Sequence, residues 1–329
     1  MIHQATNGVR GYGVDALDIA LPEFLRTTWV SDAARAAWEP KIRRCAETWQ
    51  RLEWLAAVEG IRPCAVVTVT AEQLVERGDV GRRGFVHLPL ECLGGAGGAV
   101  LGGELRYRAV VATLENAHRF RVAFEEGDDV TLGDLLGCPP CCRESFRSAW
   151  VDLGLQDPTW PIAQRSTSPH APEDRDAPGS STPARTLDIQ GPPFGNILWR
   201  WIGLRLVPHL PCRADCGSTA EIGSAIAELA GREGLGAEHD CLLEMLQWPV
   251  EWSALHGIAE IRTPILKFVV PTDGTKNKYT VRWQGTRRPA ESGRGLDFPY
   301  AAPARRKVTA SPEFQKGLEN PIRDFGSRP

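Results

Sequence analysis

Residues 258–283, IAEIRTPILKFVVPTDGTKNKYTVRW, contain three short runs rich in β-branched and aromatic residues. The runs Ile258–Arg262, Ile265–Pro271 and Lys278–Trp283 have the length and composition of strands, and Asp273-Gly274 is a dipeptide typical of hairpin turns. Strands joined by a tight hairpin turn are antiparallel, because parallel strands need a long crossover connection. This stretch therefore predicts an antiparallel sheet near the end of the folded part of the chain.

Helical patterns precede these strands. From Ala33 to Gly60 apolar residues recur every three or four positions, and Pro40 is expected to interrupt the helix. Further helices are expected at Asp128–Gly137, Asn196–Val207, Ser218–Glu233 and Glu238–Gln247. Further strands are expected at Cys64–Thr70, Glu104–Thr113 and Phe120–Glu125, the last two joined by a turn at Asn116–His118. Helices mixed with hairpin-connected strands predict an α+β fold.

Composition divides the 329 residues into three predicted parts. Residues 1–127 form an N-terminal α/β part, residues 128–283 form a core domain that contains the clustered cysteines, and residues 284–329 form an extended tail rich in Pro and Arg. Within the core domain, residues 164–188 (QRSTSPHAPEDRDAPGSSTPARTLD) are dominated by Pro, Ser and charged residues. So few apolar residues predict a disordered loop.

Charge and hydropathy exclude several classes of protein. The 38 Lys and Arg residues are balanced by 41 Asp and Glu residues, so the basic excess of a nucleic-acid-binding surface is missing. No apolar run reaches the ~18 residues of a membrane span, and the first residues lack the pattern of a signal peptide. We therefore expect a cytoplasmic protein. In a reducing compartment its nine cysteines favour metal binding or thiol chemistry, whereas in a secreted protein they would indicate disulfides.

The first cysteine cluster is GCPPCCRESF, residues 137–146. Pro139-Pro140 is expected to start a helix, because proline is favoured in the first helical turn. Cys141 and Cys142 would then lie at the positive end of the helix dipole beside Arg143, which favours the thiolate form. Cys138 forms a C-x2-C pair with Cys141 but lies before the helix, and it is the weaker candidate.

The second cluster is PHLPCRADC, residues 208–216. Pro211 is expected to open another helix, on which Cys212 and Cys216 would share one face because they are four residues apart. His209 lies in the preceding turn, from which its ring could reach the same point. Thiolates and imidazoles bind zinc, and thiolates bind iron–sulfur clusters. The predicted ligand set is Cys141, Cys142, His209, Cys212 and Cys216, in which either or both of the vicinal cysteines take part.

The two motifs, G-x-P-x-C-C-x3-F at residues 137–146 and H-x-P-C-x3-C at residues 209–216, resemble those of a family of archaeal and bacterial proteins of unknown function. The resemblance covers roughly residues 100–270. In that family the position of Cys138 is usually aromatic, which weakens the case for Cys138 as a ligand. The resemblance supports a site but implies no reaction.

A third candidate segment is WPVEWSALHGIAE, residues 248–260. If a strand begins at Ile258, His256 and Glu260 lie on one face. They could act in acid–base catalysis, or the histidine could supply an extra metal ligand. The simpler interpretation is a histidine at the edge of the core that pairs with a carboxylate.

These observations predict a cytoplasmic metal-dependent enzyme whose Cys/His site holds an iron–sulfur cluster, or alternatively zinc. An incomplete ligand set would leave a coordination position open for redox or sulfur-transfer chemistry on a small-molecule substrate. Two alternatives stay open. One is a metal-independent enzyme with Cys141 or Cys142 as the nucleophile and His209 or His256 as the base. The other is a noncatalytic protein with a structural zinc ion. The sequence indicates neither the substrate nor the oligomeric state.

Overall fold

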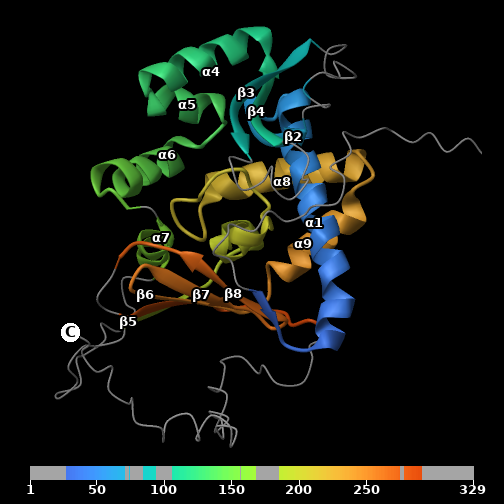
Figure 1. The fold of residues 1–329 in the computed structure, drawn as a ribbon, viewed down its shortest axis with the longest axis vertical. Helices are drawn as coiled ribbons and strands as arrows, with labels where there is room; N and C mark the ends of the chain where they lie inside the picture. The colour runs from blue at the N-terminus through green and yellow to red at the C-terminus, as the bar shows by residue number, and fades with distance from the viewer. Residues whose placement is uncertain are drawn as a thin grey trace, which may run out of the picture.

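The computed structural model describes residues 27–70, 74, 84–93, 106–155, 157–167, 185–274 and 278–290. Within them, helices combine with one six-stranded and one three-stranded sheet, which confirms the predicted α+β fold (Figure 1). Residues 168–184 of the predicted loop and residues 291–329 of the predicted tail lie outside the described residues. None of the described helices is long and apolar enough to cross a bilayer.

The six-stranded sheet has the order β1-β8-β7-β6-β9-β5, and all its pairs are antiparallel except β5–β9. Its strands are β1 (Thr27–Trp29), β5 (Arg185–Ile189), β6 (Val250–Leu255), β7 (Ile258–Arg262), β8 (Leu266–Pro271) and β9 (Tyr279–Trp283). Along these strands alternate residues such as Trp252, Phe268 and Trp283 are buried, because successive side chains of a strand point to opposite faces. One face of the sheet therefore supplies a wall of the core.

The tight hairpin of this sheet lies at His256-Gly257, between β6 and β7, and the hairpin predicted at Asp273-Gly274 is wrong. Strand β8 pairs with β7 and β1, whereas β9 pairs with β6 and β5, so the connection after β8 crosses to another part of the sheet. His256 and Gly257 have φ angles of 53° and 79°. Two successive positive φ angles are typical of a type I′ turn. An Asp-Gly dipeptide indicates a turn, but it does not specify which strands pair.

The second sheet has the order β2-β4-β3, formed by β2 (Cys64–Thr70), β4 (Arg106–Thr113) and β3 (Phe85–Leu93). Helix α1 (Asp32–Val58) packs against it and begins at the N-cap Ser31, whose hydroxyl accepts the N–H of Ala34. The expected interruption of this helix at Pro40 is wrong. Pro40 lies within α1 and is exposed, so water can reach the backbone groups that lack a helical partner there.

Helix α4 (Leu114–Glu126) occupies the segment where a turn and a strand were predicted at Asn116–His118 and Phe120–Glu125. The hydroxyl of Thr113 accepts the N–H of Asn116 at 3.3 Å and caps the helix, and Gly127 ends it in the left-handed conformation. Its buried residues recur every third position, which is a helical spacing: Ala117, Phe120 and Ala123. Helix α5 (Asp129–Leu135) follows within the segment where a helix was predicted, and the Asp128 side chain caps it.

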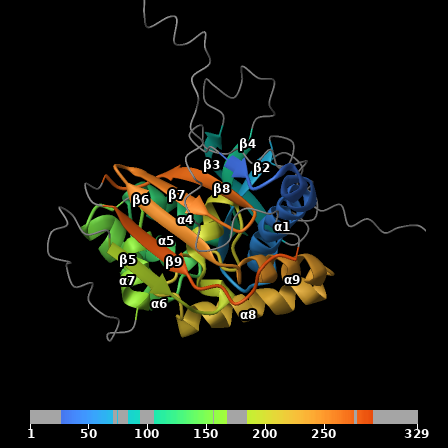
Figure 2. The ribbon, with the colours of Figure 1, turned by 90° about the horizontal axis from the view of Figure 1, so that it is seen from below.

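Helices α8 (Gly217–Arg232) and α9 (Gly236–Met245) pack against each other and against α1, beside the large sheet (Figures 1 and 2). The expected helix at Asn196–Val207 is a 3-10 helix over Ile197–Ile202. Tryptophans from α1, the 3-10 helix and the sheet share the main hydrophobic core, among them Trp38, Trp199 and Trp283. Residues from both the predicted N-terminal part (1–127) and the predicted core domain (128–283) contribute to this core. The division of the chain at residue 127 stays a prediction.

Candidate metal centre

The first cysteine pair lies at the start of helix α6 (Pro140–Arg147). Pro139 is the N-cap and Pro140 the first helical residue, so Cys141 and Cys142 occupy the first turn as predicted. Cys141 is exposed, whereas Cys142 is buried. The same turn therefore presents one thiol to solvent and the other to the interior.

The second cysteine pair is brought together by a turn and not by a helix. Helix α8 begins at Gly217, with Cys216 as its N-cap, and the helix expected to open at Pro211 is wrong. Cys212 lies just before a turn over residues 213–216, which the N–H of Cys216 closes by donating to the carbonyl of Arg213 at 3.2 Å. The chain makes a turn before helix α8 begins, so a short loop, and not a helix face, brings the sulfurs of Cys212 and Cys216 near each other.

This loop is held in place by close contacts that the sequence did not reveal. Its residue Ala214 packs against Gly195, where a Cβ atom would lie 1.8 Å from the Ala214 carbonyl oxygen. A Cβ atom at Gly191 would also approach the same oxygen, to 2.8 Å. The N–H of Ala214 donates to the hydroxyl of Ser166 at 2.7 Å. Glycine is required where two backbones approach this closely.

Arg165 connects the two cysteine-bearing segments. Its Nε donates to the carbonyl of Cys212 at 2.8 Å, and its Nη2 donates to the hydroxyl of Ser145 on α6 at 2.6 Å. Partial burial lowers the pKa of this guanidinium. Arg165 and Ser166 belong to helix α7 (Thr159–Ser166), which extends into the region predicted to be a disordered loop from residue 164. Strand β5 likewise includes the last residues of that region, from Arg185. Because residues 164–188 were predicted to be disordered, Arg165 and Ser166 were not identified as residues that position the cysteine-bearing loop.

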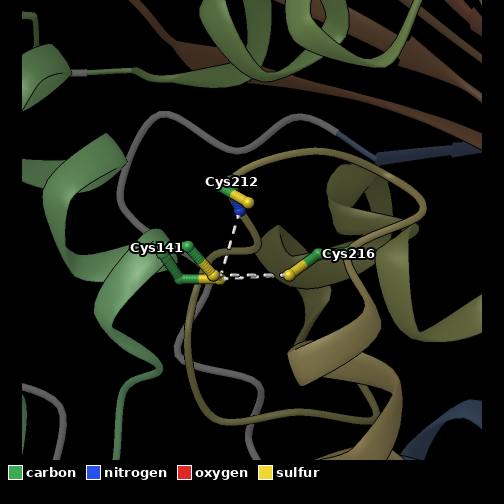
Figure 3. A group of neighbouring side chains, drawn as sticks. Cys141, Cys212 and Cys216 are labelled. Carbon is green, nitrogen blue, oxygen red and sulfur yellow. Dashed lines mark hydrogen bonds between the residues drawn. The ribbon is translucent and has the colours of Figure 1, made fainter.

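The sulfur atoms of Cys141, Cys142, Cys212 and Cys216 all lie within 4.8 Å of one another. Figure 3 labels three of these residues, Cys141, Cys212 and Cys216, whose side chains lie close together. The Sγ–Sγ distance is 3.9 Å between Cys141 and Cys142, 3.8 Å between Cys141 and Cys216, and 3.6 Å between Cys142 and Cys216. The backbone N–H of Cys212 donates to Cys142 Sγ at 3.3 Å. The structure therefore has a group of four cysteines that could hold a metal ion, and we call it the sulfur group.

Hydrogen bonding within the sulfur group separates the pKa values of its members. Burial raises the pKa of Cys142, and burial together with hydrogen bonding to Cys216 raises the pKa of Cys212 to about 11. Burial also acts on Cys216, but interactions with the hydroxyl and backbone N–H of Thr219 and with the other thiols outweigh it and lower its pKa to about 7. If a second thiol of the sulfur group loses its proton, its negative charge lies close to that of the Cys216 thiolate. A bound cation would offset the repulsion between these charges.

His209 lies outside the sulfur group and reaches it through Thr219. The Thr219 Oγ1 atom is 3.4 Å from Cys142 Sγ and 3.0 Å from His209 Nε2. His209 Nδ1 is buried, and none of the described residues forms a hydrogen bond with it. Burial lowers the pKa of His209 to about 4, helped by the positive charge of Arg62, so the imidazole is neutral near pH 7. Thr219 was not identified from the sequence, although it occupies the position three residues after an N-cap that often completes a helix cap.

The other predicted site residues lie elsewhere. His256 is exposed in the hairpin turn between β6 and β7, and Glu260 on β7 forms ion pairs with Arg262 and, at 3.7 Å, with Lys267. Neither belongs to the sulfur group, and their catalytic role stays a prediction. Cys138 is half-buried, and it is likewise not a member.

Comparison of the chain with protein-family models, with curated proteins and with solved structures finds no match. The resemblance of the two cysteine motifs to an uncharacterised family therefore stays a hypothesis. Inferences about function rest on the geometry of the site.

Proposed function

We propose that the protein binds one metal ion through Cys141, Cys142, Cys212 and Cys216, and that this ion fastens helix α6 to the loop that precedes helix α8. The size of the sulfur group carries the proposal. Four sulfurs at the usual Zn–S distance of about 2.3 Å form a tetrahedron with edges of about 3.8 Å. The three sulfur pairs given above are separated by 3.6–3.9 Å, and every pair lies within 4.8 Å.

Zinc is the first candidate for this ion, and the iron–sulfur cluster favoured by the sequence is the second. In a cluster the thiolates bind different irons that are bridged by sulfide, so some of the cysteine sulfurs must lie farther apart than on one ion. The compact sulfur group supports a single ion. A single iron ion with four thiolates has a similar size and is distinguished by its colour.

Four protein thiolates complete a tetrahedral coordination shell, and a zinc site with four protein ligands is typically structural. This supports a noncatalytic role for the ion over the open coordination position expected for redox or sulfur-transfer catalysis. His209 is held by Thr219, so it would act on the sulfurs through this hydroxyl and not as a fifth ligand. A cytoplasmic location and a small-molecule substrate stay predictions of the sequence.

Metal analysis of the full-length protein, purified without oxygen and without chelators, tests the proposal. We expect one zinc ion per chain and no visible absorption, and replacement by Co²⁺ should give the intense charge-transfer bands of thiolate ligands. Cys142→Ser should abolish stoichiometric binding, whereas the matched control Cys138→Ser, four residues earlier, should retain it. Several irons with equivalent sulfide would instead identify a cluster. Folded wild-type protein that contains no metal and takes up none would contradict the proposal and favour the metal-independent thiol enzyme.

A further inference from the structure

The sulfur group has two unlike halves. Cys142 and Cys216, which we call the inner pair, have exposed fractions of 1% and 6%. Cys141 is exposed and Cys212 is half-buried, and we call these two the outer pair. The outer pair contains one cysteine from each of the two segments, Cys141 from α6 and Cys212 from the loop before α8. A reagent that arrives from solvent therefore meets one thiol from each segment.

The hydrogen-bond donors of the site also favour the inner pair. Cys142 Sγ accepts the N–H of Cys212 at 3.3 Å and lies 3.4 Å from the hydroxyl of Thr219, and Thr219 also stabilises the thiolate of Cys216. Among the described residues, no N–H or O–H group donates to the sulfur of Cys141 or Cys212, which interact with other sulfurs. Donors around a ligand tune its reactivity, and exposure controls the access of a reagent. Both factors make the outer pair the more reactive half.

We propose that Cys141 and Cys212 are a site of oxidative modification, at which a hydroperoxide converts the two thiolates into a disulfide and releases the metal ion. This inference rests on the proposed function, in which all four cysteines bind that ion. The chemical class of the reagent is a hydroperoxide, of which hydrogen peroxide is the smallest member.

The reaction proceeds in two steps. The Cys141 thiolate attacks the terminal oxygen of the hydroperoxide, so that an S–O bond forms, the O–O bond breaks, and an alcohol or water leaves after it takes up a proton. The Cys212 thiolate then attacks the sulfur of this sulfenic acid. The S–S bond forms, the S–O bond breaks, and the hydroxide that leaves is protonated to water. Two electrons pass from the thiolates to the hydroperoxide, and the ion is left with the inner pair alone.

Among the possible disulfides within the sulfur group, the one between Cys141 and Cys212 forms most readily. A bond between Cys141 and Cys142 would link adjacent residues in the first turn of α6, and bonds to Cys142 or Cys216 would require access to a buried sulfur. A disulfide between Cys141 and Cys212 needs their sulfurs to close from within 4.8 Å to about 2.05 Å. Because Arg165 holds α6 and the loop together from the side, only a small movement of the loop is required. The disulfide then replaces the ion as the link between these segments.

Oxidation of the full-length, zinc-loaded protein with hydrogen peroxide tests this proposal. Cys241 is a competing target, since its thiol interacts with Cys45 and its pKa is lowered to about 7, so the experiment uses the Cys241→Ser background. Released zinc is measured with a chromogenic chelator, and the disulfide is located by mass spectrometry of peptides. We expect loss of the one zinc ion per chain together with a disulfide between Cys141 and Cys212, and full recovery after dithiothreitol and zinc are added.

A second measurement does not depend on a ligand variant that could fail to bind zinc. Limiting N-ethylmaleimide is added to the zinc-loaded protein, and we expect modification of Cys141 before Cys142 and Cys216. Zinc that is present before oxidation but retained after it, a disulfide that includes Cys142 or Cys216, or equal alkylation of all four thiols would overturn this proposal and leave the metal site standing. Metal analysis before the oxidant is added shows separately whether the proposed function fails.

Discussion

Gly195→Ala places a methyl group directly against the loop that carries Cys212 and Cys216. The new Cβ atom would lie 1.8 Å from the Ala214 carbonyl oxygen and 2.6 Å from its carbon, both of them backbone atoms that cannot rotate away. The loop must therefore retreat by about 1.2 Å, because carbon and oxygen atoms that are not bonded do not approach closer than about 3.0 Å. Metal–ligand distances tolerate deviations of only about 0.2 Å.

The magnitude of the effect follows from where the strain can be relieved. In the metal-free protein the loop can relieve the clash by a shift that stretches its hydrogen bonds to Ser166 and Arg165, whereas a metal ion bound by both α6 and the loop would pull Ala214 back toward residue 195. Overpacking of this kind costs about 1–3 kcal/mol, which corresponds to a loss of about five- to 150-fold in metal affinity. We expect this loss in a Co²⁺ titration followed by its charge-transfer absorption, with a competing chelator to set the free metal concentration.

Gly217→Ala is the matched control. Gly217 is the residue after Cys216 and begins α8, but a Cβ atom there would meet nothing within 4 Å, and the φ angle of this residue is not positive. We expect its metal affinity to equal that of the wild-type protein. If Gly195→Ala also binds Co²⁺ with wild-type affinity while it remains folded by circular dichroism, the position of the loop does not control the site and the reasoning is refuted.

Three further predictions concern the rest of the fold. Asp157→Ala removes the buried partner of Arg200, whose Nη2 donates to Asp157 Oδ1 at 2.7 Å. We expect the free energy of unfolding, measured by urea titration, to fall by about 3–5 kcal/mol. The control Asp188→Ala, at an exposed position of β5, should leave this free energy nearly unchanged. Burial lowers the pKa of His239 below its unfolded value of 6.5, so the unfolded state takes up the proton first and stability falls as the pH drops below about 6.5. His239→Leu should flatten this slope between pH 7 and 5, and an unchanged slope would show that other groups cause it. His256→Asn should keep the melting temperature within about 2 °C of wild type, since Asn adopts positive φ readily; a large decrease would show that the histidine ring has a structural role.

The sequence predicted the first half of the sulfur group better than the second. Two prolines before Cys141 predict a helix start, because the geometry of proline acts locally. The same reasoning failed at Pro211, where the chain makes a turn and the helix begins only after Cys216. That turn is imposed by Gly195 and Ser166, which are distant in sequence, so no local pattern could indicate it.

Strand pairing shows the same limit. The strands β7, β8 and β9 were identified from their composition, but β6 was not identified, because its residues were interpreted as a polar segment around His256. Once β6 pairs with both β7 and β9, the order of the sheet changes and Asp273-Gly274 no longer joins neighbours. Pairing partners are chosen by the packing of a whole face, which is a property of tertiary structure.

Helix α1 has a consequence for how the molecule unfolds. Along its 27 residues it first contributes Trp38 and Trp49 to the core of the large sheet, and at its end it contributes Ala57 to the core of the small sheet. Neither sheet can lose its packing without uncovering part of the same continuous hydrogen-bonded helix. Backbone amides of β2 and of β6 should therefore exchange with deuterium in one cooperative event, because both sheets pack against helix α1.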